Sequence, residues 1–202
     1  MIILASTSAR RQDILKRFVD YKIITKDIEE NNDDYENPRQ LVMALSFEKG
    51  IGVAVENKED IVLSADTVVA LDGVVMGKPK DKEDAYDMLS KLSGKEHEVY
   101  SGYSIFKLDE KIKVTNYVKT LVKFKELSEK DINDYLNTNE YIGKAGAYGI
   151  QGSGELLVES IIGDFNNVVG LPISRISDEF KSLFNISLLN EVENEKTRGK
   201  RA

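Results

Sequence analysis

Apolar positions follow two different spacings along the chain, one typical of buried strands and one typical of helices. A short apolar run at 2–4 predicts a strand, and small residues at 5–9 predict a turn. Residues 14–19 then carry Ile14, Leu15, Phe18 and Val19 on one helical face. The same reasoning predicts further strands at 21–25, 61–63, 98–108, 112–124 and 156–162, and helices beginning at Pro38, covering 81–92, following Ser128 and beginning at Pro172.

Turn signals connect these elements. Asp72-Gly73 predicts a hairpin over 68–76, and Asp109-Glu110-Lys111 separates the two longest strands. Strands that alternate with helices, together with one long hairpin, predict an α/β fold with a mixed sheet. We expect one domain over 1–190, built as two lobes that share the sheet, and a polar C-terminal tail over 191–202.

Composition narrows the classes of function. The 202 residues are 41% hydrophobic, which is enough for one sizeable core. No apolar run approaches the ~20 residues that span a bilayer, and no signal segment precedes the first strand, so we expect a cytoplasmic protein without a membrane partner. The absence of cysteine excludes disulfides and thiolate chemistry. A net charge of −7 argues against a nucleic acid polymer as partner but allows a small anion held by local cations.

The first turn and helix carry the strongest chemical signal. Ser6 and Ser8 lie in the turn, and Arg10 and Arg11 lie where the helix begins. Arginine is unfavourable at that end because the helix dipole is positive there, and a bound anion would offset the repulsion. Hydroxyls, backbone N–H groups and guanidinium groups together suit a phosphate. The alternative is a capped helix with solvated arginines.

Three further segments could contribute charge. Asp66-Thr67 lies at the end of an apolar strand, and ligands of open α/β sheets bind beyond the carboxyl ends of strands. Lys78 lies between Gly77 and Pro79, and Lys49 follows an apolar helix face. Considered alone, Asp66 is more often a turn cap, and both lysines are more often solvated surface residues.

The remaining candidates are weaker. Residues 144–152 are rich in glycine and alanine without forming a Walker loop, and Gln151 offers both a donor and an acceptor suited to a base edge. Asn166 or Asn167 would brace a loop, and the lone His97 is given no role. With no cysteine and one histidine, any bound metal would be a hard ion on oxygen ligands, hence Mg²⁺ or Mn²⁺.

These clusters, taken in order, resemble the Maf family of nucleoside triphosphate pyrophosphatases. The matching motifs are Leu4-Ala-Ser-Thr-Ser-Ala-Arg-Arg11, Ser64-Ala-Asp-Thr-Val-Val69, Gly77-Lys-Pro79, Leu92-Ser-Gly94 with His97-Glu-Val99, Lys144-Ala-Gly-Ala-Tyr-Gly-Ile-Gln-Gly152 and Val168-Val-Gly-Leu-Pro172. The resemblance implies an elongated mixed sheet flanked by helices, with a cleft between two lobes, related to the inosine triphosphatase-like enzymes. One departure is Ala9, where the family usually has proline, and its absence should loosen the loop modestly.

The resemblance also implies roles for individual residues. Asp66 is implied as the proton acceptor and Glu30 as a further acidic group in the cleft, the two sharing a divalent metal ion. Substrate binding is implied for Ser8, Arg10, Arg11, Lys49, Thr67, Lys78 and Gln151. The Ala-Asp-Thr form resembles the branch that converts dTTP and UTP to the monophosphate and pyrophosphate. A nucleotide-binding regulator of cell division, or a phosphohydrolase releasing orthophosphate, remains open, and a homodimer is plausible.

Overall fold

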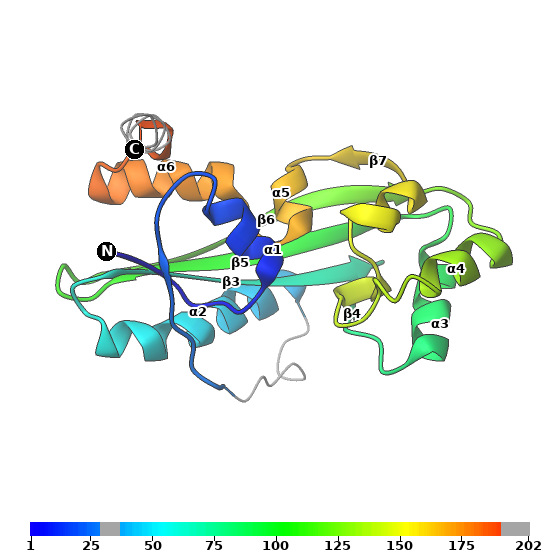
Figure 1. Cartoon of the computed structure of the whole chain (residues 1–202), viewed down its shortest axis with the longest axis horizontal. Helices are drawn as coiled ribbons and strands as arrows, with labels where there is room; N and C mark the ends of the chain where they lie inside the picture. The colour runs from blue at the N-terminus through cyan, green and yellow to red at the C-terminus, as the bar shows by residue number, and fades with distance from the viewer. Residues whose placement is uncertain (29–36, 191–202) are drawn as a thin grey trace, which may run out of the picture.

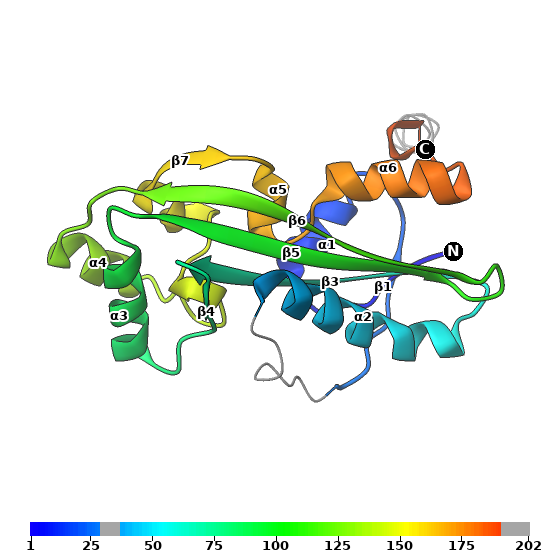
Figure 2. The same ribbon diagram turned by 180° about the vertical axis from the view of Figure 1, so that it is seen from behind.

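One mixed sheet with helices on both faces forms the framework of the molecule (Figures 1 and 2). The computed structural model describes residues 1–28 and 37–190. The strands in this part are β1 (Ile2–Leu4), β2 (Lys22–Ile23), β3 (Ile61–Leu71), β4 (Val74–Met76), β5 (Glu96–Lys107), β6 (Ile112–Phe124) and β7 (Val158–Ile162). Their order is β2-β1-β3-β5-β6-β7, and β4 pairs with β3. The pairs of β1 with β2 and β3 are parallel, and the others are antiparallel.

The helices divide between the two faces and one end of this sheet. They are α1 (Ala9–Leu15), α2 (Pro38–Glu56), α3 (Lys82–Leu92), α4 (Glu129–Leu136), α5 (Phe165–Val169) and α6 (Ile173–Phe184), with 3₁₀ turns η1 (Ala145–Ala147) and η2 (Gly152–Leu157). Figures 1 and 2 show α2 under one face, α1, α5 and α6 over the other, and α3 and α4 together at the far end. This confirms the predicted mixed sheet with flanking helices. The long strands β3, β5 and β6 run between the two ends, so the expected division into two lobes stays a prediction.

Helix α2 lies unusually close to the sheet. An added Cβ at Gly102 in β5 would fall 2.1 Å from the backbone oxygen of Val42, and one at Gly50 would fall 2.4 Å from the ring of Phe106. Only glycine leaves room for this approach. Hydrogen bonds from Ser64 Oγ to Ser46 O and between the hydroxyls of Ser46 and Ser104 fasten the contact, at 2.6 and 3.0 Å. The arrangement brings the middle of α2 against the middle of β3.

Strand β3 is much longer than the apolar run at 61–63 predicted. Its side chains alternate between the faces: Leu63 and Ala65 join the core under α1 and α6, whereas Val68 and Ala70 pack on α2. The polar pair Asp66-Thr67 interrupts the apolar run but not the pairing with β5, which continues to Ala70. The prediction that Asp66 and Thr67 lie at the end of a strand is therefore wrong, because β3 continues to Leu71 and places them in its middle, on opposite faces.

One edge of β3 carries two different neighbours with a gap between them. Strand β1 pairs up to Leu63, where Ala5 N donates to the Leu63 carbonyl at 2.7 Å, and β4 pairs from Val69 onward. Within the described part of the chain, no strand pairs with residues 64–68 on this side. Side chains from both faces of β3 can therefore be reached from this interrupted edge.

Other expectations are confirmed or corrected locally. The Asp72-Gly73 hairpin is confirmed, with φ of 51° and 81° at its two turn residues. Ser128 caps α4 and forms a capping box with Asp131. Helix α5, capped by Asp164, was not predicted, because five residues are too few for a periodic signal. Glu30 and the tail at 191–202 lie outside the described residues, and no helix among the described residues is long and apolar enough to cross a membrane.

Candidate active site

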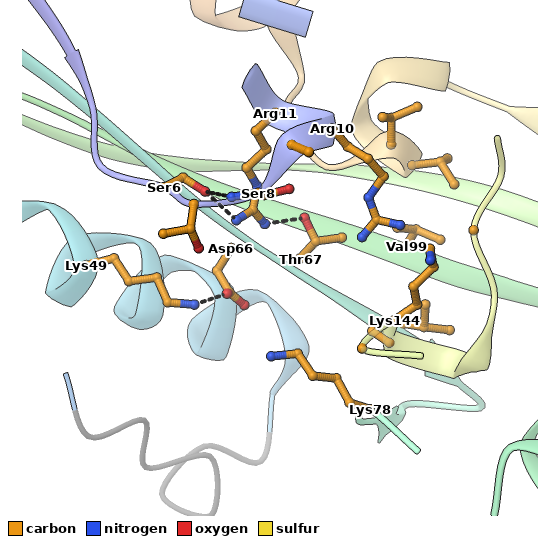
Figure 3. Close-up of a pocket in the computed structure, with 18 of the residues that line it drawn as sticks. Ser6, Ser8, Arg10, Arg11, Lys49, Asp66, Thr67, Lys78, Val99 and Lys144 are labelled. Carbon is orange, nitrogen blue, oxygen red and sulfur yellow. Dashed lines mark hydrogen bonds and ion pairs between the residues drawn. The ribbon is translucent and has the colours of Figure 1, made fainter. Parts of the chain in front are cut away.

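A cavity of about 620 Å³ opens beside the interrupted edge of β3 (Figure 3). The predicted site residues that the structure describes all line it: Ser8, Arg10, Arg11, Lys49, Asp66, Thr67, Lys78 and Gln151. They come from the β1–α1 turn, the start of α1, α2, β3, the segment after β4 and the loop between the two 3₁₀ turns. The fold thus brings these scattered segments together around one cavity.

Asp66 and Lys49 form an ion pair on the α2 face of β3. Lys49 Nζ donates to Asp66 Oδ1, and the side chains are 21% and 12% exposed. The second carboxylate oxygen, Oδ2, accepts no hydrogen bond from any residue within 1–28 or 37–190. Lys49 thus fixes the carboxylate through Oδ1, and Oδ2 can accept a proton or bind a ligand in the cavity.

Arg11 is bound into the opposite face of β3. Its Nε donates to the Gly170 carbonyl at 2.9 Å and its Nη2 to Thr67 Oγ1 at 3.1 Å. Thr67 Oγ1 is in turn 2.7 Å from Ser101 Oγ, which donates to the Asn167 carbonyl at 2.8 Å. Arg11 therefore holds the start of α1 against β3 and the end of α5. The sequence predicted a phosphate contact for Arg11 but not this structural role.

The β1–α1 turn is organised around Ser6. Its buried hydroxyl accepts from Ser8 N at 3.3 Å and from Arg11 Nη1 at 3.4 Å. Ser8 precedes the first residue of α1, and its own hydroxyl makes no capping bond. The Ser8 hydroxyl therefore stays available to a ligand in the cavity, whereas Ser6 is structural.

Arg10 and Lys144 lie together at another part of the cavity wall (Figure 3). Burial lowers the pKa of both groups, and the charge of Arg10 lowers the pKa of Lys144 further. Lys144 Nζ donates to the backbone carbonyl of Glu140. Lys144 belongs to one of the matching sequence motifs but had no predicted role, because spacing along the chain could not reveal its neighbour Arg10.

The loop that carries Lys144 and Gln151 is held from behind. The Glu140 carboxylate accepts from Ser153 N at 3.0 Å and from Ser153 Oγ at 2.9 Å. Gly149 N donates to Tyr135 Oη at 3.2 Å. Gln151 lies exposed at the rim between these anchors. The loop is therefore a fixed wall of the cavity that presents one amide side chain at its opening.

Lys78 approaches from the segment after β4. The carbonyl of the preceding Gly77 accepts from Gly146 N at 3.0 Å, which ties this segment to η1. Figure 3 shows the ammonium of Lys78 directed toward the Lys49–Asp66 pair. Among the described residues, the cavity is lined by two carboxylates, Asp27 and Asp66, and by six cationic side chains: Arg10, Arg11, Lys26, Lys49, Lys78 and Lys144. Such a concentration of positive charge suits a polyanionic ligand.

Comparison with known proteins identifies the family of this chain. The family model described as Maf-like protein matches residues 1–183. The chain belongs to the Maf family. This finding confirms the resemblance drawn from the six motifs, and the match runs through every segment that lines the cavity.

Relatives of this Maf protein carry a consistent name. A protein of Clostridioides difficile (strain 630) named dTTP/UTP pyrophosphatase is 56% identical over 192 residues, 95% of this chain and 99% of that protein. Proteins of the same name from Ruminiclostridium cellulolyticum and Bacillus anthracis are 44% and 46% identical, over 90% and 93% of this chain and 95% and 97% of theirs. The solved Ham1 protein of Staphylococcus aureus aligns over 99% of this chain and 97% of that one, with 16% identity and a TM-score of 0.46.

A metal ion would depend on few protein ligands in this Maf protein. Within the described residues, no three acidic or histidine side chains gather in a metal-binding group. Asp66 and Asp27 are the carboxylates among these residues that line the cavity. This fits Mg²⁺ or Mn²⁺, which bind one or two carboxylates and take their other ligands from substrate phosphates and water. Glu30, the second predicted ligand, lies outside the described residues.

Two polar residues next to the cavity are structural, as the sequence analysis favoured. Asn167 is fully buried, and its amide nitrogen donates to the Val99 carbonyl and to Thr120 Oγ1, both at 3.0 Å. His97 is 1% exposed, and its Nε2 lies 2.7 Å from Tyr148 Oη. His97 therefore supports Tyr148, which lines the cavity, and does not itself reach the cavity.

Proposed function

We propose that this Maf family member is a nucleoside triphosphate pyrophosphatase that converts dTTP and UTP to the nucleoside monophosphate and pyrophosphate. The observation that carries the proposal is Asp66, fastened by Lys49, within one cavity that also holds Arg10, Lys78 and Lys144. The relatives named dTTP/UTP pyrophosphatase over nearly the whole chain support the choice of substrate.

The chain's residues divide the reaction between binding and proton transfer. Lys78, Lys49 and the Ser8 hydroxyl bind oxygens of the triphosphate and offset charge that develops on it. Asp66 Oδ2 orients a water molecule and accepts its proton as the water oxygen attacks the α-phosphorus in line. The bond between that phosphorus and the bridging oxygen breaks, and pyrophosphate leaves with the electron pair. No covalent enzyme intermediate is required.

The divalent cation that we propose, Mg²⁺ or Mn²⁺, would be held by Asp66, by Glu30 as the family resemblance implies, and by phosphate oxygens. When bound, such an ion neutralises phosphate charge and orients the chain for in-line displacement. Because Lys49 holds Oδ1 of Asp66, the water and the ion would both depend on Oδ2, so the two roles of Asp66 compete.

The decisive experiment compares Asp66→Asn with the unchanged protein on dTTP and UTP. The amide keeps the shape but accepts a proton poorly, so turnover should fall by about 10²- to 10⁴-fold with folding intact. Asp13→Asn, at an exposed residue on α1 paired with Lys16, is the matched control and should keep full turnover. Near-normal turnover by Asp66→Asn would overturn the assignment.

Product analysis separates the remaining candidates. Pyrophosphate in equal amount to the monophosphate supports the proposal, whereas orthophosphate would indicate a different phosphohydrolase. Nucleotide binding without release of either product would favour a regulator of cell division that senses nucleotides without consuming them.

A further inference from the structure

The cavity has two chemically different regions. Around the Lys49–Asp66 pair, the wall is polar and includes the Ser8 hydroxyl. Around Arg10 and Lys144, the wall is largely apolar and includes Val69, Val99 and Tyr148. Val69 and Val99 are opposite partners on β3 and β5, and Figure 3 shows Val99 beside Arg10 and Lys144. A phosphate chain suits the first region, and a planar ring suits the second.

The two cations of the apolar region are held close to one backbone position. An added Cβ at Gly149 would fall 2.8 Å from Lys144 Cε and 3.5 Å from Arg10 Nη1. A side chain at position 149 would therefore displace the end of Lys144 from its present position next to Arg10. Gly149 itself is anchored, since its N–H donates to Tyr135 Oη at 3.2 Å.

These cations have unused hydrogen-bonding capacity. Lys144 Nζ donates to the Glu140 carbonyl, a neutral acceptor, and forms no ion pair with any carboxylate in the described ranges 1–28 and 37–190. An ammonium has three N–H donors and a guanidinium has five, and neither accepts a hydrogen bond. Two adjacent positive charges beside apolar side chains therefore favour a ligand that offers acceptors at this point.

We infer that Lys144 is a specificity-determining residue that, with Arg10, donates to the carbonyl oxygens of a pyrimidine-2,4-dione ring packed against Val69, Val99 and Tyr148. The inference rests on the proposed function and assigns the base of the substrate to this region. Uracil and thymine carry acceptor oxygens at positions 2 and 4. Cytosine carries an amino donor at position 4, which donor-only side chains cannot bind. A buried donor left facing another donor is costly, so the region selects against cytosine.

A phosphate-binding role for Lys144 is the competing explanation, and the surroundings argue against it. The wall next to Lys144 supplies valine and tyrosine side chains, whereas the hydroxyl group and the carboxylate suited to a metal-bound triphosphate lie with Lys49 and Ser8. Lys78, whose ammonium points toward the Lys49–Asp66 pair, is the lysine better placed for the phosphates.

The test compares Lys144→Met with Lys78→Met on UTP and CTP. Methionine keeps much of the lysine's apolar length and removes the donor. Loss of a charged hydrogen bond should lower kcat/KM for UTP by about 10- to 100-fold and leave CTP nearly unchanged, so the preference for UTP narrows. Lys78→Met should lower kcat/KM for UTP and for CTP by a similar factor.

Binding measurements make the result independent of turnover. UMP and CMP carry the base with one phosphate, and pyrophosphate carries no base. Lys144→Met should weaken binding of UMP but leave CMP and pyrophosphate unchanged, and Lys78→Met should weaken pyrophosphate most. Lys144→Gln is the folding safeguard, because its amide can still donate to the Glu140 carbonyl and can turn its oxygen toward an amino group. It should shift the preference toward CMP.

Two outcomes would overturn the inference. In the first, Lys144→Met weakens UMP, CMP and pyrophosphate alike, which would make Lys144 a phosphate ligand. In the second, neither Lys144 variant changes the ratio of UMP to CMP binding, which would make it a structural residue of the loop. Failure of the proposed function is distinct from both, since it appears as an unchanged protein that releases no pyrophosphate from any triphosphate.

Discussion

Acid should destabilise this protein through His97, and the size of the effect follows from its surroundings. Burial without a charged partner lowers the pKa of His97 from 6.5 to about 4. Its Nε2 meets Tyr148 Oη, and its Nδ1 has no hydrogen-bond partner among the described residues. The rings of Phe124 and Tyr148 pack edge-on against the imidazole, at centroid distances of 5.0 and 5.4 Å. The folded protein therefore holds the imidazole in its neutral form.

The sign of the effect follows from proton binding in the two states. The unfolded chain takes up a proton at His97 near the ordinary pKa, whereas the folded chain resists it until about pH 4. The free energy of unfolding should thus be unaffected by His97 above pH 7 and should fall as the pH drops from 6.5 to 4. Between pH 7 and pH 5, the two pKa values give a loss of about 2 kcal/mol from this residue.

Urea unfolding at pH 7 and pH 5 measures this loss, with His97→Gln as the reference. The glutamine amide can replace the Nε2 contact to Tyr148 and does not titrate. Carboxylates contribute equally to the pH response of both proteins, so the difference between the two responses belongs to His97. We expect the unchanged protein to lose about 2 kcal/mol more than His97→Gln between these pH values. Equal losses would refute the reasoning.

Three further perturbations test the packing, the brace and the metal. Gly102→Ala should cost about 2–3 kcal/mol in the free energy of unfolding and reduce turnover, because the new methyl group meets the Val42 backbone and pushes α2 away from the sheet. Arg11→Lys should cost about 2 kcal/mol and raise KM, because one ammonium cannot donate to Gly170 O and Thr67 Oγ1 in the same geometry. A chelator should abolish turnover, and added Mg²⁺ or Mn²⁺ should restore it.

Each of these perturbations has a control. Gly52→Ala, also on α2, meets only the flexible Lys26 side chain at 3.2 Å and should not lower stability. Arg175→Lys alters an exposed arginine 3.8 Å from Glu179 and should have little effect on stability or KM. The control for the chelator is a calorimetric titration of the chelated protein with Mg²⁺ or Mn²⁺ and the nucleoside monophosphate. Binding would show that the chelator removed the ion without denaturing the protein. A stable Gly102→Ala protein would contradict the close approach of α2.

Sequence patterns predicted much of the fold because several signals were local. Pro38, Ser128 and Pro172 lie where helices begin, and Asp72-Gly73 adopts the positive φ angles that a tight hairpin needs. The length of β3 could not be predicted in this way. Its apolar alternation is interrupted by Asp66-Thr67, and only pairing with β5, more than thirty residues away, extends the strand through them.

The candidate site was predictable as a set of residue types but not as an arrangement. Arg10 and Arg11 are adjacent in sequence, yet Arg11 reaches Thr67 and Gly170 whereas Arg10 faces Lys144. This division depends on the orientation of α1 over β3, which no local pattern encodes. Lys144 was missed for the same reason, since its chemical character comes from the charge and burial supplied by distant segments.

The interrupted edge of β3 bears on self-association as well as on ligand binding. Unpaired strand edges invite a strand from a second molecule, and long flat edges are the most vulnerable. Among the residues that the structure describes, the gap covers only 64–68, is closed at its two ends by neighbours of opposite direction, and has charged lysines nearby. Such an edge is too short and too charged to template fibre growth, so the molecule can keep part of its backbone accessible without polymerising.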